Sequence, residues 1–203
     1  LNSNSKILDI GCGRGKILGN LYSRIKLKNK PLGIDIINHK DKDKRIRFKK
    51  INVSKFFINN KEKFDLIIIK QTIHLLSFYE IKRLLHFSNK KLNSRGKIFI
   101  FTLDTNNNEI PTFKLMKVKL IKSLKRDNKI INVISKLYSH SVKKKFYFKV
   151  KITKKRYLKM IQNKYISTLS NLSKKDLLKG TEEINLRYKK TIKFSDKLIC
   201  LIL

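Results

Sequence analysis

The sequence predicts an α/β protein built on a doubly wound, mostly parallel sheet, and three observations lead to this prediction. Short apolar runs alternate with longer segments of helical periodicity, which is typical of parallel strands joined by crossover helices. The chain has 203 residues, a length that suits a single domain over residues 1–203. Its apolar content of 41% is enough to form a core.

The first three strands are expected from three apolar runs. Residues 6–10 predict a strand, and residues 16–25 predict a helix with its apolar side chains on one face. The run at 32–36 follows Pro31, which suits the entry of a strand, and the next run lies at 46–53.

Two further strands complete the regular part of the sheet. The segment FDLIII at 64–69 is almost continuously apolar, which indicates a strand buried on both faces. A helix is expected at 78–92, and the turn at 94–96 leads into the strand KIFIFTL at 97–103. Five strands with such connections predict a doubly wound sheet.

The alternation becomes less regular after residue 103. A polar loop is followed by two amphipathic segments at 115–124 and 130–138, and we expect residues 104–145 to form a lid on the substrate side. The rest of the chain predicts strands at 146–152 and 191–203 and helices at 154–161 and 174–188.

The net charge of +36 favours, at first sight, a nucleic acid or an anionic membrane surface as partner. Composition offers another explanation, because the chain has no alanine or tryptophan and is rich in the residues that an AT-rich genome favours, such as lysine, asparagine and isoleucine. Only nine of its 50 basic residues are arginine, the usual residue for bidentate recognition of bases and phosphates. We interpret the charge mainly as codon drift, with non-specific binding of polyanions as a side effect.

The sequence lacks the patterns of a membrane span, a signal peptide and a metal site. No apolar stretch reaches the roughly 18 residues of a membrane span, and no signal-peptide pattern is present, so we expect a cytoplasmic protein that does not bind membranes. Cys12 and Cys200 form neither a disulfide framework nor a metal spacing, so we expect no metal. The start at Leu1 suggests that an N-terminal segment is missing.

Three of the seven glycines, Gly11, Gly13 and Gly15, directly follow the first strand. Ligands of open parallel sheets bind beyond the carboxyl ends of the strands, beside the first strand, where glycines let the backbone approach a ligand. Asp35 ends the second strand, at the position where a carboxylate accepts hydrogen bonds from ribose hydroxyls. Together these features predict a ligand that contains adenosine.

The spacing of the glycines narrows the choice of ligand. Dinucleotide folds use G-x-G-x-x-G to bind a pyrophosphate, whereas this chain has D-x-G-x-G-x-G. The carboxylate of Asp9 would repel a pyrophosphate but could hold the ammonium group of an amino acid.

At ILDIGCGRG, residues 7–15, the chain resembles the class I S-adenosylmethionine-dependent methyltransferases, in particular their small-molecule branch. The resemblance extends through GIDI at 33–36, INVSKF at 51–56, FDLIIIKQTIHLL at 64–76 and RGKIFIFT at 95–102. It implies a seven-stranded sheet with a reversed last strand and S-adenosylmethionine as cofactor.

The resemblance also implies roles for individual residues. Asp35 would hold the ribose, and Asp9 would lie near the methionine portion. The other cofactor-binding positions that it implies are Gly11, Cys12, Gly13, Gly15, Ile36, Asn52, Val53, Lys70 and Gln71. Asn52 stands where the family often has an acid, and Lys70 would place a cation near a sulfonium.

His74 is the one candidate for acid/base catalysis, because it falls in the loop that faces the expected acceptor and an imidazole titrates near neutral pH. A packed histidine without a catalytic role is the alternative. Methyl transfer by in-line displacement needs a base only for some acceptors.

A small molecule is the favoured acceptor. The Asn/Asp-Pro-Pro-aromatic signature of base amine methylation is replaced here by KQTI, and neither cysteine suits cytosine-C5 chemistry. An RNA methyltransferase or RNA-binding module, and an NAD-dependent oxidoreductase, remain the alternatives. The oligomeric state is not predicted.

Overall fold

The computed structural model describes residues 1–203 and contains one seven-stranded sheet with the strand order β3-β2-β1-β4-β5-β7-β6. The first five strands pair in parallel, and the order reverses between β1 and β4. The strands are β1 (Ile7–Ile10), β2 (Leu32–Asp35), β3 (Arg47–Lys50), β4 (Phe64–Lys70), β5 (Leu92–Leu103), β6 (Val142–Thr153) and β7 (Thr191–Ile202).

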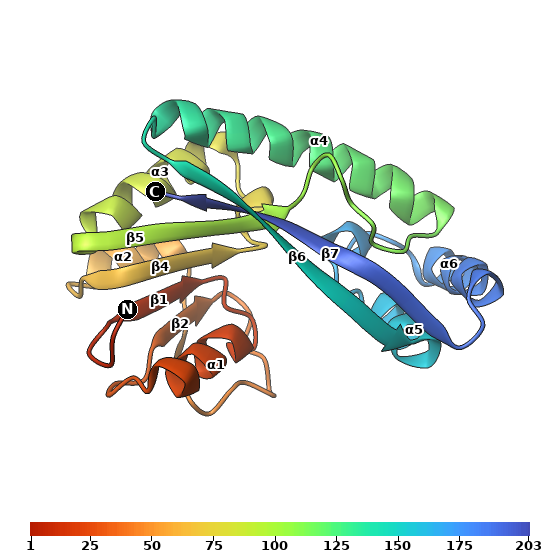
Figure 1. Ribbon diagram of the computed structural model, residues 1–203, viewed down its shortest axis with the longest axis horizontal. Helices are drawn as coiled ribbons and strands as arrows, with labels where there is room; N and C mark the ends of the chain where they lie inside the picture. Colours follow the sequence, from red (N-terminus) through yellow and green to blue (C-terminus); the bar gives the residue numbers. More distant parts are fainter. The chain divides into compact units, whose positions relative to one another are not determined.

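The connections are mainly helical, as Figure 1 shows. The α-helices are α1 (Lys16–Ile25), α2 (Val53–Asn59), α3 (Phe78–Lys90), α4 (Lys114–Leu137), α5 (Lys154–Gln162) and α6 (Lys174–Arg187). Two 3-10 turns, η1 (Ile73–Leu75) and η2 (Ser167–Leu169), complete the elements. None of the helices combines the length and the apolar character needed to cross a bilayer.

The last strand is reversed, as the resemblance implied. Ile98 of β5 and Leu203 exchange both of their backbone hydrogen bonds, at 3.1 and 3.0 Å. Such a reciprocal pair is the mark of antiparallel strands. The predicted fold class is therefore confirmed: a doubly wound, mostly parallel sheet with an antiparallel last strand.

Packing divides the chain into two compact units. The first unit comprises Leu1–Thr102, Ile134–Lys144 and Ile199–Leu203, and the second comprises Leu103–Val133 and Lys145–Leu198. The single domain over 1–203 and the lid at 104–145 stay predictions.

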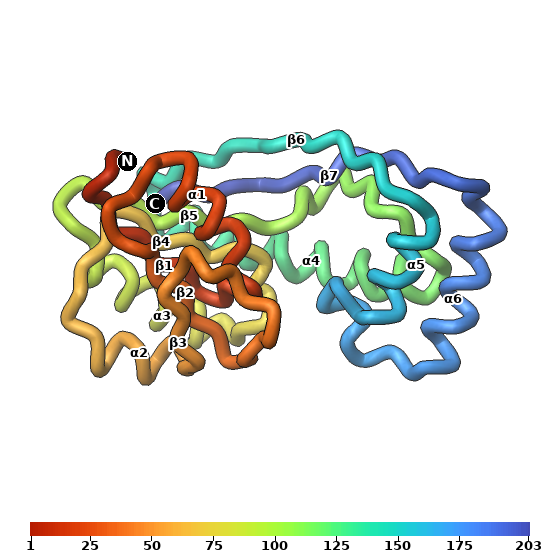
Figure 2. Tube along the Cα trace, turned by 90° about the horizontal axis from the view of Figure 1, so that it is seen from below, coloured from red at the N-terminus to blue at the C-terminus, as the bar shows by residue number.

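The first unit is layered, with its strands between α1 on one side and α2 and α3 on the other (Figure 2). Side chains of β4 alternate between the two layers, because successive residues of a strand point to opposite faces. Leu66 and Ile68 pack with Leu18 of α1. On the side of α2 and α3, the rings of Phe57 and Phe87 stack with centroids 6.2 Å apart.

The second unit has its own core, which gathers side chains from α4, α5, α6 and β7. Phe113, Tyr157 and Ile184 are almost completely buried in it. Gly180 of α6 allows the close contact with Phe113, since a Cβ at this glycine would lie 2.6 Å from the ring.

Two helices differ from the prediction. The segments expected at 115–124 and 130–138 form one continuous helix, α4. The sequence suggested two segments because Asp127, a polar residue, occupies a buried position in the apolar stripe of this helix. The strand expected at 46–53 ends at Lys50, and Asn52 then caps the unpredicted helix α2 by accepting a hydrogen bond from the Ser54 N–H at 2.8 Å. Asparagine is a strong helix N-cap.

Candidate functional site

The glycine-rich turn lies at the carboxyl end of β1, where the strand order reverses. Its three glycines differ in what surrounds their Cα atoms. All three have positive φ angles, between 54° and 72°. A Cβ on Gly11 would come within 2.2 Å of the Thr72 Oγ1, and one on Gly15 within 2.1 Å of the Ile46 Cδ1. A Cβ on Gly13 would meet nothing within 4 Å. Gly13 is therefore the position at which the backbone can approach a ligand.

Asp35 joins the end of β2 to this turn. Its Oδ2 accepts a hydrogen bond from the Gly13 N–H at 2.8 Å, and its Oδ1 accepts one from the Ile37 N–H at 2.9 Å. A carboxylate has about four acceptor positions, so these two bonds orient Asp35 and leave acceptor capacity for hydroxyl groups.

The amide groups of the turn are largely used within the protein. The N–H groups of Gly11 and Cys12 both donate to the Ile34 carbonyl, at 2.9 and 3.1 Å. These hydrogen bonds fix the shape of the turn and occupy both N–H groups, while the implied contact of Gly11 and Cys12 with a cofactor stays a prediction. Contacts with a ligand here would have to come from carbonyl groups and from the open face of Gly13.

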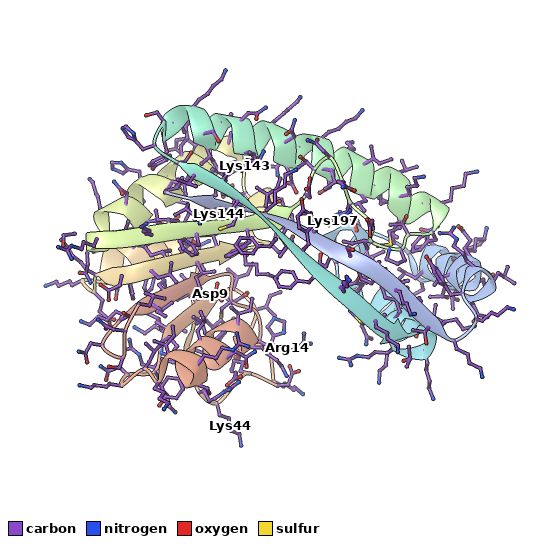
Figure 3. All side chains as sticks on the ribbon, in the orientation of Figure 1. Asp9, Arg14, Lys44, Lys143, Lys144 and Lys197 are labelled. Atoms are coloured by element: carbon purple, nitrogen blue, oxygen red, sulfur yellow. The ribbon has the colours of Figure 1, made fainter.

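Asp9 is the second acidic side chain of the site and is 2% exposed. Its Oδ1 is buried and has no hydrogen-bond partner. Burial raises the pKa of the Asp9 carboxyl to about 7, an effect that the Lys70 charge partly offsets and the Asp35 charge increases. Asp9 pairs with Gly33 of β2 and Ile68 of β4, so Asp35 and Lys70, each two residues further along its strand, lie on the same face of the sheet as Asp9. Figure 3 marks Asp9 in β1 and Arg14 within the glycine-rich turn.

Cys12 has an inert thiol. Burial raises its pKa to about 12, with further contributions from Asp9 and Asp35. Its sulfur packs against β2 at Gly33, where a Cβ would lie 2.6 Å from the Sγ. The side chain of Cys12 therefore serves packing, and any contact with a ligand would come from its backbone.

Three residues predicted for the adenine side follow β2 and β3. Ile36 is 66% exposed at the carboxyl end of β2, so its apolar side chain is available to a flat ring. Val53 is the first residue of α2, a position whose N–H has no partner within a helix. Asn52 uses its carbonyl oxygen to cap α2, so its amide NH₂ is the group left to face outward.

The chain after β4 forms a strained turn beside the glycines. Gln71 has a φ of 54°, which is unfavourable for a residue with a side chain, and its N–H donates to the Phe101 carbonyl at 2.9 Å. The Thr72 hydroxyl donates to the carbonyls of Lys70 and Gly11, at 3.1 and 3.5 Å. His74 lies in the following 3-10 turn, half-buried.

Sequence reasoning missed Thr72 and Ile46. Both side chains fill the space that Gly11 and Gly15 leave open, and Thr72 also bonds to the turn. No local signal marks them, because Thr72 is 61 positions from Gly11 along the chain. Only the pairing of β1 with β4 brings Thr72 close to Gly11.

A hollow lies at the other end of the strands, away from the glycine-rich turn. A cavity of about 410 Å³ opens at the amino ends of the strands, lined by Lys6, Pro31, Arg47, Glu62 and Phe64 among others. None of the predicted site residues lines it.

The buried, unpartnered oxygen of Asp9 and the open face of Gly13 fit a ligand with a cationic group, and Asp35 beside them fits one with hydroxyl groups. The doubly wound sheet with its reversed last strand defines the class I methyltransferase fold.

The family follows from the sequence itself. The model of the methyltransferase domain family matches residues 1–141, and the chain belongs to this family. No curated protein sequence matches the chain significantly.

Solved structures of low sequence identity share the fold. A protein assigned as a methyltransferase of an antibiotic biosynthesis pathway in Anabaena variabilis is 15% identical, with a TM-score of 0.61 over 98% of this chain and 91% of that one. Precorrin-6y C5,15-methyltransferase from Geobacter metallireducens is 9% identical, with a TM-score of 0.55 over 100% and 80%. The plantazolicin methyltransferase BpumL, in complex with a monoazolic desmethylPZN analogue and SAH, is 16% identical, with a TM-score of 0.52 over 98% and 75%.

Proposed function

We propose that this chain is an S-adenosylmethionine-dependent methyltransferase that acts on a small-molecule acceptor. The observation that carries the proposal is the pair of acidic side chains on the paired strands β1 and β2, Asp9 with its unpartnered oxygen and Asp35 bonded to the open Gly13 backbone, in a member of the methyltransferase domain family. When bound, the cofactor supplies an electrophilic methyl group on a positively charged sulfur.

Two carboxylates would hold the opposite ends of the cofactor. Asp35, already oriented by Gly13 and Ile37, would accept hydrogen bonds from the ribose hydroxyls. Asp9 would pair through its free oxygen with the ammonium group of the methionine portion, and that cation would keep the buried carboxylate ionised. The backbone of Gly11, Cys12, Gly13 and Gly15 would form the wall between them.

The remaining predicted residues would complete the cofactor site. Ile36 would pack on one face of the adenine, and the free N–H of Val53 and the amide of Asn52 would contact its edge. Lys70 and Gln71 would lie near the methionine portion, where Lys70 limits the cost of ionising Asp9.

His74 would act on the acceptor side of the site. Holding the acceptor and the methyl group in line can lower the barrier by roughly 7 to 11 kcal/mol without any proton transfer. An acceptor that must lose a proton would need a base within reach, and His74, in the turn after β4, is our candidate for it.

The small-molecule acceptor is supported by two considerations. The end of β4 and the turn that follows read KQTI, which lacks the signature of base amine methylation. The precorrin methyltransferase shares the fold of this chain. A cytoplasmic location accords with this function and stays a prediction.

Calorimetry with S-adenosylhomocysteine tests the proposal. We expect binding near a Kd of 1 μM, or about −8 kcal/mol. Asp35→Ala should weaken binding by about 10- to 100-fold, since hydrogen bonds to a charged group contribute about 1.5 to 3 kcal/mol. Glu62→Gln, at the other end of the strands, is the matched control and should bind as the unchanged protein does.

Two results would overturn the assignment. Binding of NAD without binding of S-adenosylhomocysteine would favour an oxidoreductase. Equal affinity of Asp35→Ala, folded as judged by circular dichroism, would remove the carboxylate from the site.

A further inference from the structure

The outermost strand of the sheet carries a surface outside the candidate cofactor site. β6 is the last strand in the order, so one of its edges has no neighbouring strand. Eight consecutive residues, from Val142 to Lys149, are exposed. Within the second unit, Lys145, Tyr147, Lys149 and Lys151 share one side of the strand, because side chains alternate. We call these four residues the β6 face.

The β6 face lies in a segment without acidic residues. From Lys145 to Lys175 the chain has ten lysines and arginines and no aspartate or glutamate. Lys145 has one ion pair, with the buried Asp104 at 3.7 Å, whereas neither Lys149 nor Lys151 has an acidic partner within 4 Å. Their positive charges are therefore available to an anionic partner.

The β6 face combines its lysines with an exposed aromatic ring, which charge alone does not provide. Tyr147 is 57% exposed in the middle of the β6 face, and Phe148 is 53% exposed on the opposite side of the strand. Lys145 and Lys149 flank Tyr147, each about 7 Å away along the strand. An aromatic ring between cations combines a stacking surface with positive charge, the two features that unpaired nucleic-acid strands require.

Other partners fit the β6 face less well. Edge-to-edge pairing with a second copy would bring lysines opposite lysines, which is unfavourable. An anionic bilayer favours several apolar side chains on the same side as the lysines, and here Phe148 points to the other side. A duplex hides the faces of its bases, so it could use only the charge.

We propose that the β6 face binds a single-stranded nucleic acid, with phosphates contacting Lys149 and Lys151 and a base stacked on Tyr147. The proposal does not depend on methyl transfer, since it involves none of the residues assigned to the cofactor.

Fluorescence anisotropy of the full chain with a labelled 12-nucleotide oligo-uridine tests the stacking. Tyr147→Ala should weaken binding by about 5- to 150-fold, the range measured for loss of one stacked base, whereas Tyr147→Phe should retain it. Tyr79→Ala removes a tyrosine of α3 that is 67% exposed, and this variant should bind as the unchanged protein does.

Salt titration tests the charges. Replacing both Lys149 and Lys151 with glutamine should reduce the slope of log K against log salt by about 1.4, since each phosphate contact on a single strand contributes about 0.7. Lys122 and Lys125 are exposed on α4, and the same double replacement there removes equal charge and should leave the slope unchanged.

Three outcomes would overturn the proposal. If the two lysine pairs lower the salt slope equally, or if Tyr147→Ala binds with unchanged affinity, then net charge alone explains the binding. A duplex of the same length that binds as tightly would exclude stacking. Tyr147-dependent binding to phosphatidylserine vesicles, without binding to oligo-uridine, would assign the β6 face to a membrane.

Discussion

Asp9 is a carboxylate that is buried away from water, and its ionised form lowers the stability of the folded protein. It is 2% exposed, and one of its oxygens lacks a hydrogen bond. A buried carboxyl stays neutral unless a cation accompanies it, which is why burial raises its pKa to about 7. Strongly shifted groups of this kind concentrate at functional sites.

We expect Asp9→Asn to stabilise the protein at alkaline pH. The folded-state pKa of Asp9, about 7, lies above the ordinary value of 3.8, so the folded state binds this proton more tightly. The stabilisation that this bound proton gives the folded state is complete below about pH 4 and is lost as the pH rises through 7. Each pKa unit corresponds to about 1.4 kcal/mol, so the gain at pH 8 can reach roughly 4 kcal/mol. Urea unfolding at pH 4, 6 and 8 measures it.

The same substitution should weaken the binding of S-adenosylhomocysteine at pH 8, because the ammonium group loses its partner. A variant that is no more stable than the original protein at pH 8 would contradict the burial argument, and one that binds normally would contradict the pairing.

Thr72 is expected to position the glycine turn. Thr72→Val keeps the packing against Gly11 but loses the hydroxyl that bonds to the carbonyls of Lys70 and Gly11. We expect a loss of about 1 kcal/mol in unfolding free energy and a several-fold weaker affinity for S-adenosylhomocysteine, measured by calorimetry. Thr72→Ser retains the hydroxyl and should keep most of the affinity, and an equal loss in both variants would point to packing alone.

At the scale of elements, α1 holds the loop that leaves β2. Arg45 donates to Ser23 and Asn20 of α1, at 2.9 and 3.2 Å, and to Asp43 at 2.7 Å. Gly19 of α1 makes room for this loop, since a Cβ there would lie 2.3 Å from the Asp43 carboxylate. The loop begins directly after Asp35 and Ile36, so its anchoring helps to order the candidate site.

Arg45→Lys should lower the urea midpoint of unfolding although it keeps the charge. A lysine has a single donor group in place of the planar fork and cannot reach Ser23, Asn20 and Asp43 together. Urea unfolding measures the change. Lys44→Met is the control, because the side chain of Lys44 extends into solvent (Figure 3), and a similar loss there would show that the loop is sensitive to any substitution.

Element type was predictable where the apolar period is unbroken. The expected helices at 16–25, 154–161 and 174–188 agree with α1, α5 and α6 within a residue. The apolar period did not predict α4 as one helix, because Asp127 is a polar residue in a buried position. It did not predict α2 either, because this helix has only seven residues and depends on its cap and on Phe57 packing against α3.

At the scale of the whole molecule, the net charge of +36 opposes folding, because a compact state brings like charges together. The 50 basic residues outnumber the 14 acidic ones, so most positive charges have no acidic partner to offset this repulsion.

We therefore expect the thermal midpoint to rise with salt. Between 0.01 and 0.15 M salt the screening length falls from about 30 to about 8 Å, which weakens repulsion between distant lysines. Differential scanning calorimetry in sodium chloride measures the midpoint, and sucrose at equal osmolality is the control. An unchanged or lower midpoint would show that attractive pairs balance the repulsion.

The sequence alone determined the parallel sheet, the place of the glycine turn and the acidic residues at the ends of two strands, because these depend on local periodicity and on residues close together in the chain. The tertiary structure decided which glycine faces open space, that Thr72 and Ile46 fill the other two, and that Asp9 is buried without a hydrogen bond. Those properties come from contacts between residues tens of positions apart, and burial is set by everything that packs around a group rather than by its neighbours in sequence.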